Sequence, residues 1–166
     1  MNYTIEEMKA SDWPQVAAIY WEGIQTKIAT FQAELPSWEQ WDKGHSPACR
    51  LVARQNETVL GWAALSPVSD RCVYRGVANV SIYIGGEHKQ QGIGQALMLQ
   101  LIKRSEEAGF WTLESRIIKE NSASLALHAK CGFRLIGVRE KLGKMDTGKW
   151  HDCVLMERRS PLVGID

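Results

Sequence analysis

Two glycines at the start of a helical pattern are the residues of this chain whose type and spacing most directly indicate chemistry. Gly92 and Gly94 follow a polar segment, residues 88–91, and precede apolar residues at helical spacing, Leu97 and Leu101. The first N–H groups of a helix have no acceptor inside the helix, and the helix dipole adds partial positive charge there. Because glycine has no Cβ, a phosphate can approach these N–H groups closely. The pattern therefore predicts a pyrophosphate site.

The segment before these glycines has the pattern of a strand. Between residues 77 and 84 apolar and polar residues alternate, so that Asn79 and Ser81 share the face opposite Val80. Two further glycines then end the strand pattern. The chain is thus predicted to form a strand, a glycine-bearing turn and an amphipathic helix over residues 93–107.

Three kinds of nucleotide site compete for this turn. A P-loop requires GxxxxGK[ST], which the sequence does not contain. A dinucleotide fold requires GxGxxG, but Leu97 occupies the third glycine position. Glu114 lies about 20 residues further on, where an acid that binds ribose is expected, so this alternative is weakened rather than excluded. The third alternative is a site for coenzyme A.

The sequence of the turn resembles a known loop. Residues 89–96, KQQGIGQA, are similar to the acyl-CoA pyrophosphate loop of the GNAT N-acetyltransferases, Q/R-x-x-G-x-G/A, with Lys89 where Gln or Arg is usual. The preceding SIYI strand and the later segment 121–133 also resemble segments of that family, and the resemblance covers nearly the whole chain. The VSIYI strand and the late GKWHD segment make the chain most similar to the phosphinothricin and methionine sulfoximine acetyltransferase group.

Periodicity along the chain predicts a mixed order of strands and helices. Strands are expected at residues 3–8, 51–54, 59–65, 77–84, 111–116, 133–142 and 150–157. Helices are expected after Ser11 or Asp12, from residue 36 or 37 to about 43, over 93–107, and after Asn121. The resemblance implies the GNAT acyl-CoA N-acyltransferase fold, an α+β (mixed α/β) single domain over residues 1–166. In that fold a mostly antiparallel, twisted sheet of about seven strands is flanked by about four helices.

Composition excludes several classes of partner. The 166 residues are 45% hydrophobic and 23% charged with a formal net charge of +1, so nothing favours nucleic acid or an anionic membrane. No apolar run approaches the roughly 20 residues that span a bilayer, and the N-terminal segment lacks the apolar core of a signal peptide. The four cysteines form no CxxC pair, so we expect reduced thiols, a cytoplasmic location and no metal.

The resemblance implies that acetyl-CoA binds where two strands separate. In the family the central strand and the strand after the main helix splay apart, and their open main chain binds the pantetheine arm. The strand residues that would hold the arm and polarise the thioester carbonyl are Ile82, Tyr83 and Ile84. The pyrophosphate would be bound by Lys89, Gln90, Gln91, Gly92, Ile93, Gly94, Gln95 and Ala96. Asn121 and Ser124 would contact the arm from the other side, and Lys130 either reaches a phosphate or stays solvated.

Acetyl transfer requires an amine that has lost its proton, because an ammonium ion has no lone pair. Close relatives in the resembled group carry Glu at the position of Asn79, and an amide is no base near neutral pH. Either Asn79 orients a water, or Glu34 or Asp152 serves as the base, or the acceptor differs. His128 occupies the position of a Tyr that protonates the leaving thiolate in many GNAT enzymes, with a structural role as the alternative.

Residues for the acceptor are expected in three segments. Arg75, with Arg71, precedes the central strand and can bind an acceptor carboxylate, with Tyr74 as an apolar wall. The resemblance places further acceptor-site residues in an early and a late segment: Phe31, Glu34, Trp38, Trp41, Trp150 and Asp152. Ordinary packing and solvated charge are the alternative for all of these side chains.

The resemblance implies transfer of an acetyl group from acetyl-CoA to the primary amine of a small acceptor by direct attack on the thioester. The expected acceptor is the α-amino group of an amino acid or analogue of the phosphinothricin or methionine sulfoximine type. The alternatives are a different amine, such as a polyamine, an aminoglycoside or a protein N-terminus, or a non-catalytic acyl-CoA-binding regulator. Because the resembled group forms dimers, a homodimer is expected.

Overall fold

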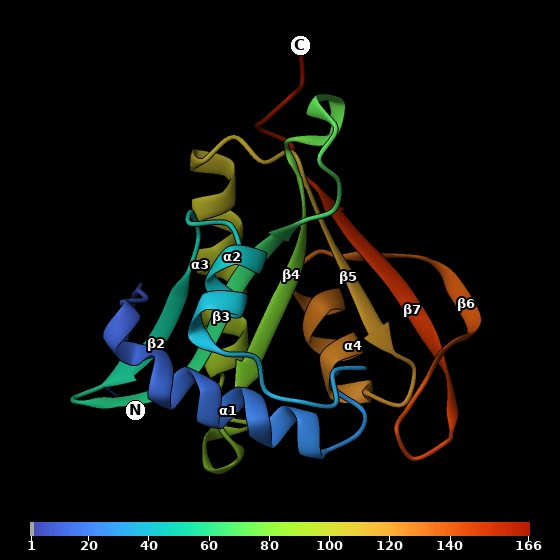
Figure 1. The fold of residues 1–166 in the computed structure, drawn as a ribbon. Coiled ribbons are helices and arrows are strands. Elements are labelled where there is room, and N and C mark those ends of the chain that lie inside the picture. Colours follow the sequence, from blue (N-terminus) through green and yellow to red (C-terminus); the bar gives the residue numbers. More distant parts are fainter. Residues whose placement is uncertain (1) are drawn as a thin grey trace.

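The computed structural model describes residues 2–166, which form a seven-stranded sheet with helices on both faces (Figure 1). The strands are β1 (Thr4–Glu7), β2 (Leu51–Gln55), β3 (Thr58–Pro67), β4 (Val77–Ile84), β5 (Thr112–Ile118), β6 (Arg134–Lys144) and β7 (Trp150–Arg159). The helices are α1 (Trp13–Gln25), α2 (Trp38–Gly44), α3 (Ile93–Glu107) and α4 (Ser122–Lys130). Three short 3-10 turns are η1 (Ala10–Asp12), η2 (Cys72–Tyr74) and η3 (Gly86–His88).

The strand order is β1-β2-β3-β4-β5-β7-β6. Within residues 2–166 the pair β4–β5 is the one parallel pair, and all other neighbours are antiparallel. The predicted α+β fold, with its seven strands, four helices and mostly antiparallel sheet, is therefore confirmed for the described residues.

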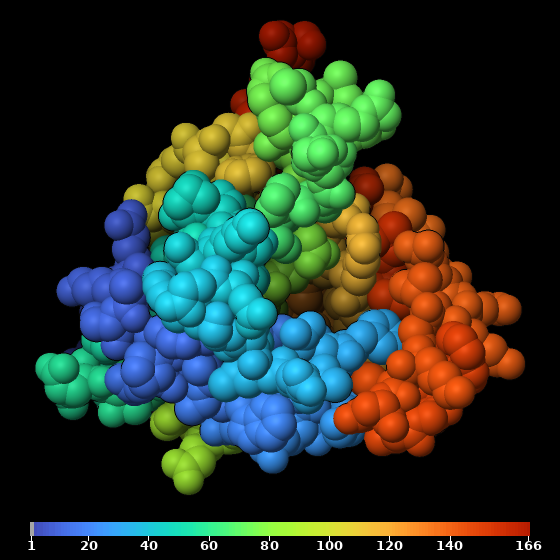
Figure 2. All heavy atoms as spheres, in the orientation of Figure 1, coloured from blue at the N-terminus to red at the C-terminus, as the bar shows by residue number. Residues whose placement is uncertain are grey.

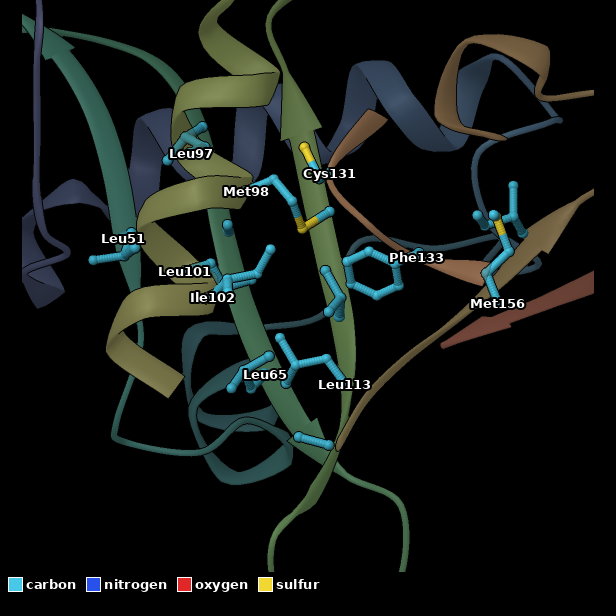
Figure 3. Packing of buried hydrophobic residues seen from close by; sticks show 14 of the residues in the cluster. Leu51, Leu65, Leu97, Met98, Leu101, Ile102, Leu113, Cys131, Phe133 and Met156 are labelled. Atoms are coloured by element: carbon cyan, nitrogen blue, oxygen red, sulfur yellow. The ribbon is translucent and has the colours of Figure 1, made fainter. Parts of the chain in front are cut away.

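Helices α3 and α4 cover one face of the sheet. Leu97, Met98 and Leu101 recur at helical spacing, are fully buried, and pack against strand residues such as Leu65 and Leu113 (Figure 3). Burial of each such side chain contributes roughly 1.5–3 kcal/mol, so this layer fixes α3 firmly on the sheet.

Helices α1 and α2 cover the other face with an aromatic layer. Val16 and Ile19 of α1 and Trp41 of α2 pack on Trp62 of β3, and both tryptophans are 1% exposed. The rings of Trp41 and Trp62 meet edge to face at 5.6 Å between centroids. The two faces therefore differ in chemistry, aliphatic under α3 and aromatic under α1 and α2.

Strands β4 and β5 separate after a short paired segment. Their register contains Val77↔Thr112, Ala78↔Leu113 and Asn79↔Glu114, and no pairing follows within the described residues. Figure 1 shows the two ribbons diverging towards the end at which α4 lies. The later residues of β4 therefore present main-chain groups on one edge that no strand covers.

Helix caps agree with the sequence prediction at α4 and differ at α1. Asn121 accepts a hydrogen bond from the Ser124 N–H at 3.2 Å and so caps α4. Asp12 stands at the N-cap position of α1, but its carboxylate accepts from the Lys9 N–H at 2.8 Å and from Arg54 Nη2 at 2.7 Å. The turn η1 precedes α1 directly, so this carboxylate ties η1 to β2 instead of capping the helix.

Membrane spans, metal sites and disulfides are further features that residues 2–166 could contain. No helix in this part of the chain combines the length and apolar character needed to cross a bilayer. No group of three His, Cys, Asp or Glu side chains in it is arranged to hold a metal ion. The cysteines Cys49, Cys72, Cys131 and Cys153 are free thiols.

Candidate active site

The N-terminus of α3 carries N–H groups that have no partner within residues 2–166. The first hydrogen bond of this helix runs from the Ala96 N–H to the Gly92 carbonyl at 3.1 Å. Within residues 2–166, no acceptor is found for the N–H groups of Ile93, Gly94 and Gln95. These donors and the positive end of the helix dipole suit an anion, as the sequence predicts for this loop.

The loop before α3 adds to this site through its backbone conformation. Gln90 and Gly92 have φ angles of 61° and 79°, in the left-handed region. Left-handed residues within a short loop turn successive N–H groups towards one point, which is the geometry of an anion-binding nest. Lys89, Gln90, Gln91 and Gly92 are all exposed, so an anion can reach these groups.

Gly94 allows three elements to meet beside the anion site. A Cβ on Gly94 would lie 3.3 Å from Leu127 Cδ2 of α4 and 3.7 Å from Ile84 Cγ1 of β4. A larger side chain would force α4 or β4 away, so the glycine sets this approach. The open edge of β4 therefore leads directly to the N-terminus of α3.

His128 on α4 is a buried, hydrogen-bonded side chain. It is 2% exposed, its Nδ1 donates to the Ser124 carbonyl at 2.7 Å, and its Nε2 accepts from the Ser115 hydroxyl at 2.7 Å. Burial lowers the pKa of His128, so the ring is neutral near pH 7. Because both nitrogens are engaged, the ring has no free proton for a leaving thiolate. The acid role that the resemblance implied for His128 does not fit this geometry, which favours the structural alternative.

A hollow opens on the face that carries α1 and α2. Figure 2 shows it bordered by α2, by the light-green loop after β3, by β5 in gold and by the light-blue segment after α1. Ala78 and Val80 point into the core under α3, so strand alternation turns Asn79 and Ser81 towards this face. Asn79 Oδ1 is buried and has no hydrogen-bond donor within residues 2–166. An acceptor atom in this state is suited to a ligand N–H or a water.

Aromatic rings line the side of this face beneath α1. The Tyr83 ring lies 4.9 Å from that of Tyr20 and 5.0 Å from that of Trp62, measured between centroids. Burial raises the pKa of Tyr83, so its hydroxyl stays protonated. The side chain of Tyr83 is thus part of the aromatic layer, and only its main chain remains for the predicted contact with the pantetheine arm.

The segment after α1 crosses to the β6–β7 hairpin. The Phe31 ring packs on Gly143, where an added Cβ would lie 2.5 Å from Phe31 Cε1, and it meets His151 at 6.4 Å between centroids. Lys27 forms an ion pair of 2.7 Å with Asp146 at the tip of the hairpin. These contacts tie the segment after α1, which borders the hollow in Figure 2, to the hairpin, and the acceptor role of Phe31 stays a prediction.

Two arginines lie in the loop between β3 and β4, at the upper border. The Arg71 guanidinium lies 5.7 Å from the centre of the Tyr74 ring, and that of Arg75 lies 5.7 Å from the centre of the Trp111 ring. Both arginines are exposed, and neither forms an ion pair with a carboxylate in the described part of the chain. Their positive charges are therefore available to an anionic group of a ligand.

Comparison with known proteins decides the family. The sequence model of the Acetyltransferase (GNAT) family matches residues 12–133. The chain belongs to the GNAT acetyltransferase family. It is 33% identical over 165 residues to a phosphinothricin N-acetyltransferase of Alcaligenes faecalis, covering 93% of this chain and 81% of that protein. It is 26% identical to an L-methionine sulfoximine/L-methionine sulfone acetyltransferase of Pseudomonas aeruginosa, covering 95% of this chain and 94% of that protein.

A solved structure of this GNAT family supports the same assignment. A phosphinothricin acetyltransferase of Sinorhizobium meliloti in complex with AcCoA is 28% identical and has a TM-score of 0.88. The match covers 100% of this chain and 92% of that one. The predicted family is therefore confirmed.

In the structure of this GNAT chain, the other predicted acceptor residues do not lie together. Glu34 is exposed in the segment after α1. Strand alternation on β7 turns His151 towards Phe31, so Trp150 and Asp152 point to the opposite face. Asp152 accepts from the Lys141 N–H at 2.9 Å, and this bond lowers the pKa of the Asp152 carboxyl. The structure thus gives Trp150 and Asp152 no place in the hollow, contrary to the sequence prediction.

Two side chains on the hollow's face were not among the predicted site residues. His151 is 4% exposed and its Nδ1 lies 3.0 Å from Glu120 Oε2. Glu114 on β5 is the strand partner of Asn79, although the sequence suggested only a ribose-binding role for it. The sequence pointed to Glu114 only through the alternation of side chains along β5. The face of the sheet on which Glu114 lies follows only from the register between β5 and β4.

Proposed function

We propose that this protein transfers the acetyl group of acetyl-CoA to the α-amino group of a small amino acid or amino-acid analogue. The observation that carries the proposal is the set of unpaired N–H groups at the start of α3, beside two separated strands, in a chain of this family. Relatives named as phosphinothricin and methionine sulfoximine acetyltransferases support the acceptor class.

The cofactor side of the proposed site consists mainly of main-chain groups. The N–H groups of residues 93–95 would bind the diphosphate, and the open edge of β4 at Ile82, Tyr83 and Ile84 would pair with the pantetheine amides like an added strand. Acetyl-CoA supplies the acetyl group as an activated thioester. A β4 N–H directed at the thioester oxygen would stabilise the negative charge that develops when the amine attacks.

The α4 side chains would act on the carrier mainly by shaping the other wall. Asn121 Oδ1 is used as the cap of α4, and the Ser124 carbonyl accepts from His128, so the Asn121 amide N–H groups and the Ser124 hydroxyl, 3.4 Å from His128 Nδ1, remain for the arm. Lys130 is exposed at the end of α4 and Lys89 is exposed before α3, where each can approach a phosphate.

The acceptor side consists of side chains from distant segments. Arg75 and Arg71 would bind the acceptor carboxylate, and Tyr74 and Phe31 would contact its side chain from opposite borders of the hollow. The buried Oδ1 of Asn79 would accept a hydrogen bond from the acceptor amine or from a water beside it. This arrangement presents cations to a carboxylate and oxygen atoms to an amine, which matches an α-amino acid.

The test is a panel of acceptors mixed with the protein and acetyl-CoA, with release of free thiol as the readout. The panel contains amino acids, phosphinothricin, methionine sulfoximine, a polyamine, an aminoglycoside and an N-terminal peptide. We expect turnover to be fastest on an amino acid or analogue. A faster reaction with the polyamine, aminoglycoside or peptide would support the other acceptor classes, and coenzyme A binding without any turnover would support a regulator.

We also propose a homodimer and a cytosolic location. Strand β6 is an edge of the sheet, and Leu135, Ile136 and Val138 on it are 60%, 41% and 46% exposed. Such an apolar edge favours pairing with a second copy. Light scattering of the parent and of Val138→Lys tests this, because a dimer through β6 should become monomeric in the variant. The free thiols are in keeping with a reducing compartment.

A further inference from the structure

Four polar residues form a line across the centre of the sheet. Ser66 on β3, Asn79 on β4, Glu114 on β5 and Glu157 on β7 are successive strand partners. Side chains of directly opposed residues point to the same face, so all four lie on the face that carries the hollow. Asn79 and Glu114 are the last pair before β4 and β5 separate.

The position of this pair is where the thioester must lie. The diphosphate site is at the open end of the gap, beside the N-terminus of α3, and the gap closes at Asn79 and Glu114. An extended arm that starts at the open end therefore brings its thioester towards the closed end. An acceptor amine that attacks from the hollow then meets the side chains of Asn79 and Glu114.

Both side chains have oxygen atoms available to an amine. Asn79 Oδ1 is buried without a donor. The Glu114 side chain is 20% exposed. Its Oε1 accepts a long hydrogen bond of 3.3 Å from Nη2 of Arg116, whose side chain is 53% exposed. By contrast, Glu157 is held by Arg134 Nη2 at 2.9 Å. A carboxylate with a weak partner beside an unpaired acceptor suits an ammonium group.

We infer that Glu114 is the general base of this enzyme and that Asn79 Oδ1 holds a second N–H of the acceptor amine. The inference rests on the proposed function and deepens it. It supplies a base where β4 has none, because β5 places a carboxylate directly opposite the amide of Asn79.

In the proposed step one proton moves to the carboxylate and a second one to the sulfur. The acceptor ammonium gives one proton to Glu114, and the freed lone pair forms the bond from nitrogen to the acetyl carbon. The C–S bond breaks and the sulfur leaves with its electron pair as a thiolate. The proton that the new amide nitrogen loses neutralises the thiolate, and Glu114 returns its own proton to solvent. No separate acid is required, in agreement with the engaged state of His128.

The test compares Glu114→Gln with the matched control Glu157→Gln. Both variants remove one carboxylate from the same line of the same face, on neighbouring strands. For Glu114→Gln we expect kcat/KM for the acceptor near pH 7 to fall by about 100-fold or more, the usual range for loss of a general base. Affinity for acetyl-CoA, measured by calorimetry, should stay at the parent's value in both variants, which also shows that they fold.

The pH profile distinguishes a base from a merely structural residue. Glu114 is flanked by Arg116 on its own strand, by Glu157 on β7 and by Asn79 on β4, so Glu157→Gln reports the effect of charge alone. Glu114→Gln lacks the base and can react only with acceptor molecules whose amine is already unprotonated in solution. Because that fraction rises tenfold per pH unit, kcat/KM of the variant should rise about tenfold per pH unit up to the pKa of the acceptor amine. The parent and Glu157→Gln should show a much flatter profile.

Two outcomes would overturn the inference while leaving the proposed function intact. The first is a parent that acetylates amino acids and a Glu114→Gln variant with the same rate and pH profile. The second is an equal loss in both variants with parallel pH profiles. If the parent acetylates no amine at all, the proposed function fails and the inference fails with it.

Discussion

The two sides of the gap between β4 and β5 offer different kinds of chemical group to a ligand. On the side of α3 the groups offered to a ligand are N–H groups of one short loop and the edge of one strand. On the side of the hollow they are side chains from the segment after α1, from the loop before β4, and from β4 and β5. The proposed carrier side therefore depends on backbone conformation, whereas the proposed acceptor side depends on individual side chains.

This difference predicts how each side responds to substitution. A backbone site tolerates most changes of side chain and fails where a glycine is lost. A side-chain site changes its affinity and specificity with single substitutions and leaves binding of the carrier untouched. Single substitutions on either side of the gap test this contrast.

Gly92→Glu should have the largest effect. Gly92 has φ 79°, where an L-residue costs about 1–2 kcal/mol, and the new carboxylate would face the diphosphate. Affinity for acetyl-CoA, measured by calorimetry, should fall by about 100-fold or more. The matched control is Gly109→Glu, because Gly109 has φ 87° beyond the other end of α3 and no atom lies near an added Cβ. Equal affinities for the parent and Gly92→Glu would contradict the account.

The same contrast explains what the sequence could predict. Residues 89–96 lie in one segment, and the change from strand to helix period on either side of Gly92 marks their place. The element order followed from periodicity for the same reason. Glu114 and Asn79 are 35 positions apart, and only the strand register brings them together. Trp150 and Asp152 were misplaced because a strand's face depends on its partners, here Gly143 opposite His151.

His128→Leu should affect stability more than catalysis. The substitution removes two buried hydrogen bonds and leaves the Ser115 hydroxyl and Ser124 carbonyl without their partner, which costs about 2–4 kcal/mol. The free energy of unfolding in urea should fall accordingly. Turnover per folded molecule should stay near the parent's value, with an unchanged pH profile. A stable variant with a large loss of turnover and an altered pH profile would instead restore the acid role.

The parent's stability should also fall as the pH drops below about 6.5. The folded-state pKa of His128 lies below that of an unfolded chain, so between the two values the unfolded chain binds a proton that the folded chain does not. Unfolding is then favoured by up to about 1.4 kcal/mol per pH unit for each such histidine. Burial lowers the pKa of His45 in the same direction, so His128→Leu should reduce this slope without abolishing it.

Arg75→Gln should weaken the acceptor side alone. Loss of a charge-assisted contact to a carboxylate corresponds to about a tenfold higher KM for the amino acid. The KM for acetyl-CoA should not change, because Arg75 precedes β4 at the end where β4 and β5 are paired, whereas the proposed diphosphate loop follows the other end of β4. Arg104→Gln, an exposed arginine of α3, is the control and should alter neither value. A rise in the KM for acetyl-CoA in Arg75→Gln would show that the arginine serves the carrier instead.

Lys27→Ala should have the smallest effect. The ion pair between Lys27 and Asp146 is exposed, so its loss costs little stability and mainly loosens the contact of Phe31 with the hairpin. We expect a rise in acceptor KM of about twofold, matched by Asp146→Ala and not increased in the double variant. Additive effects in the double variant would mean that the two side chains act separately.

The most direct test of the central claim is a titration of the isotope-labelled protein with acetyl-CoA, followed by the amide resonances in NMR. The account predicts that the N–H signals of Ile93, Gly94 and Gln95 shift strongly, while that of Gly109 at the far end of α3 stays in place. Tight binding of acetyl-CoA with these three signals unmoved would contradict it.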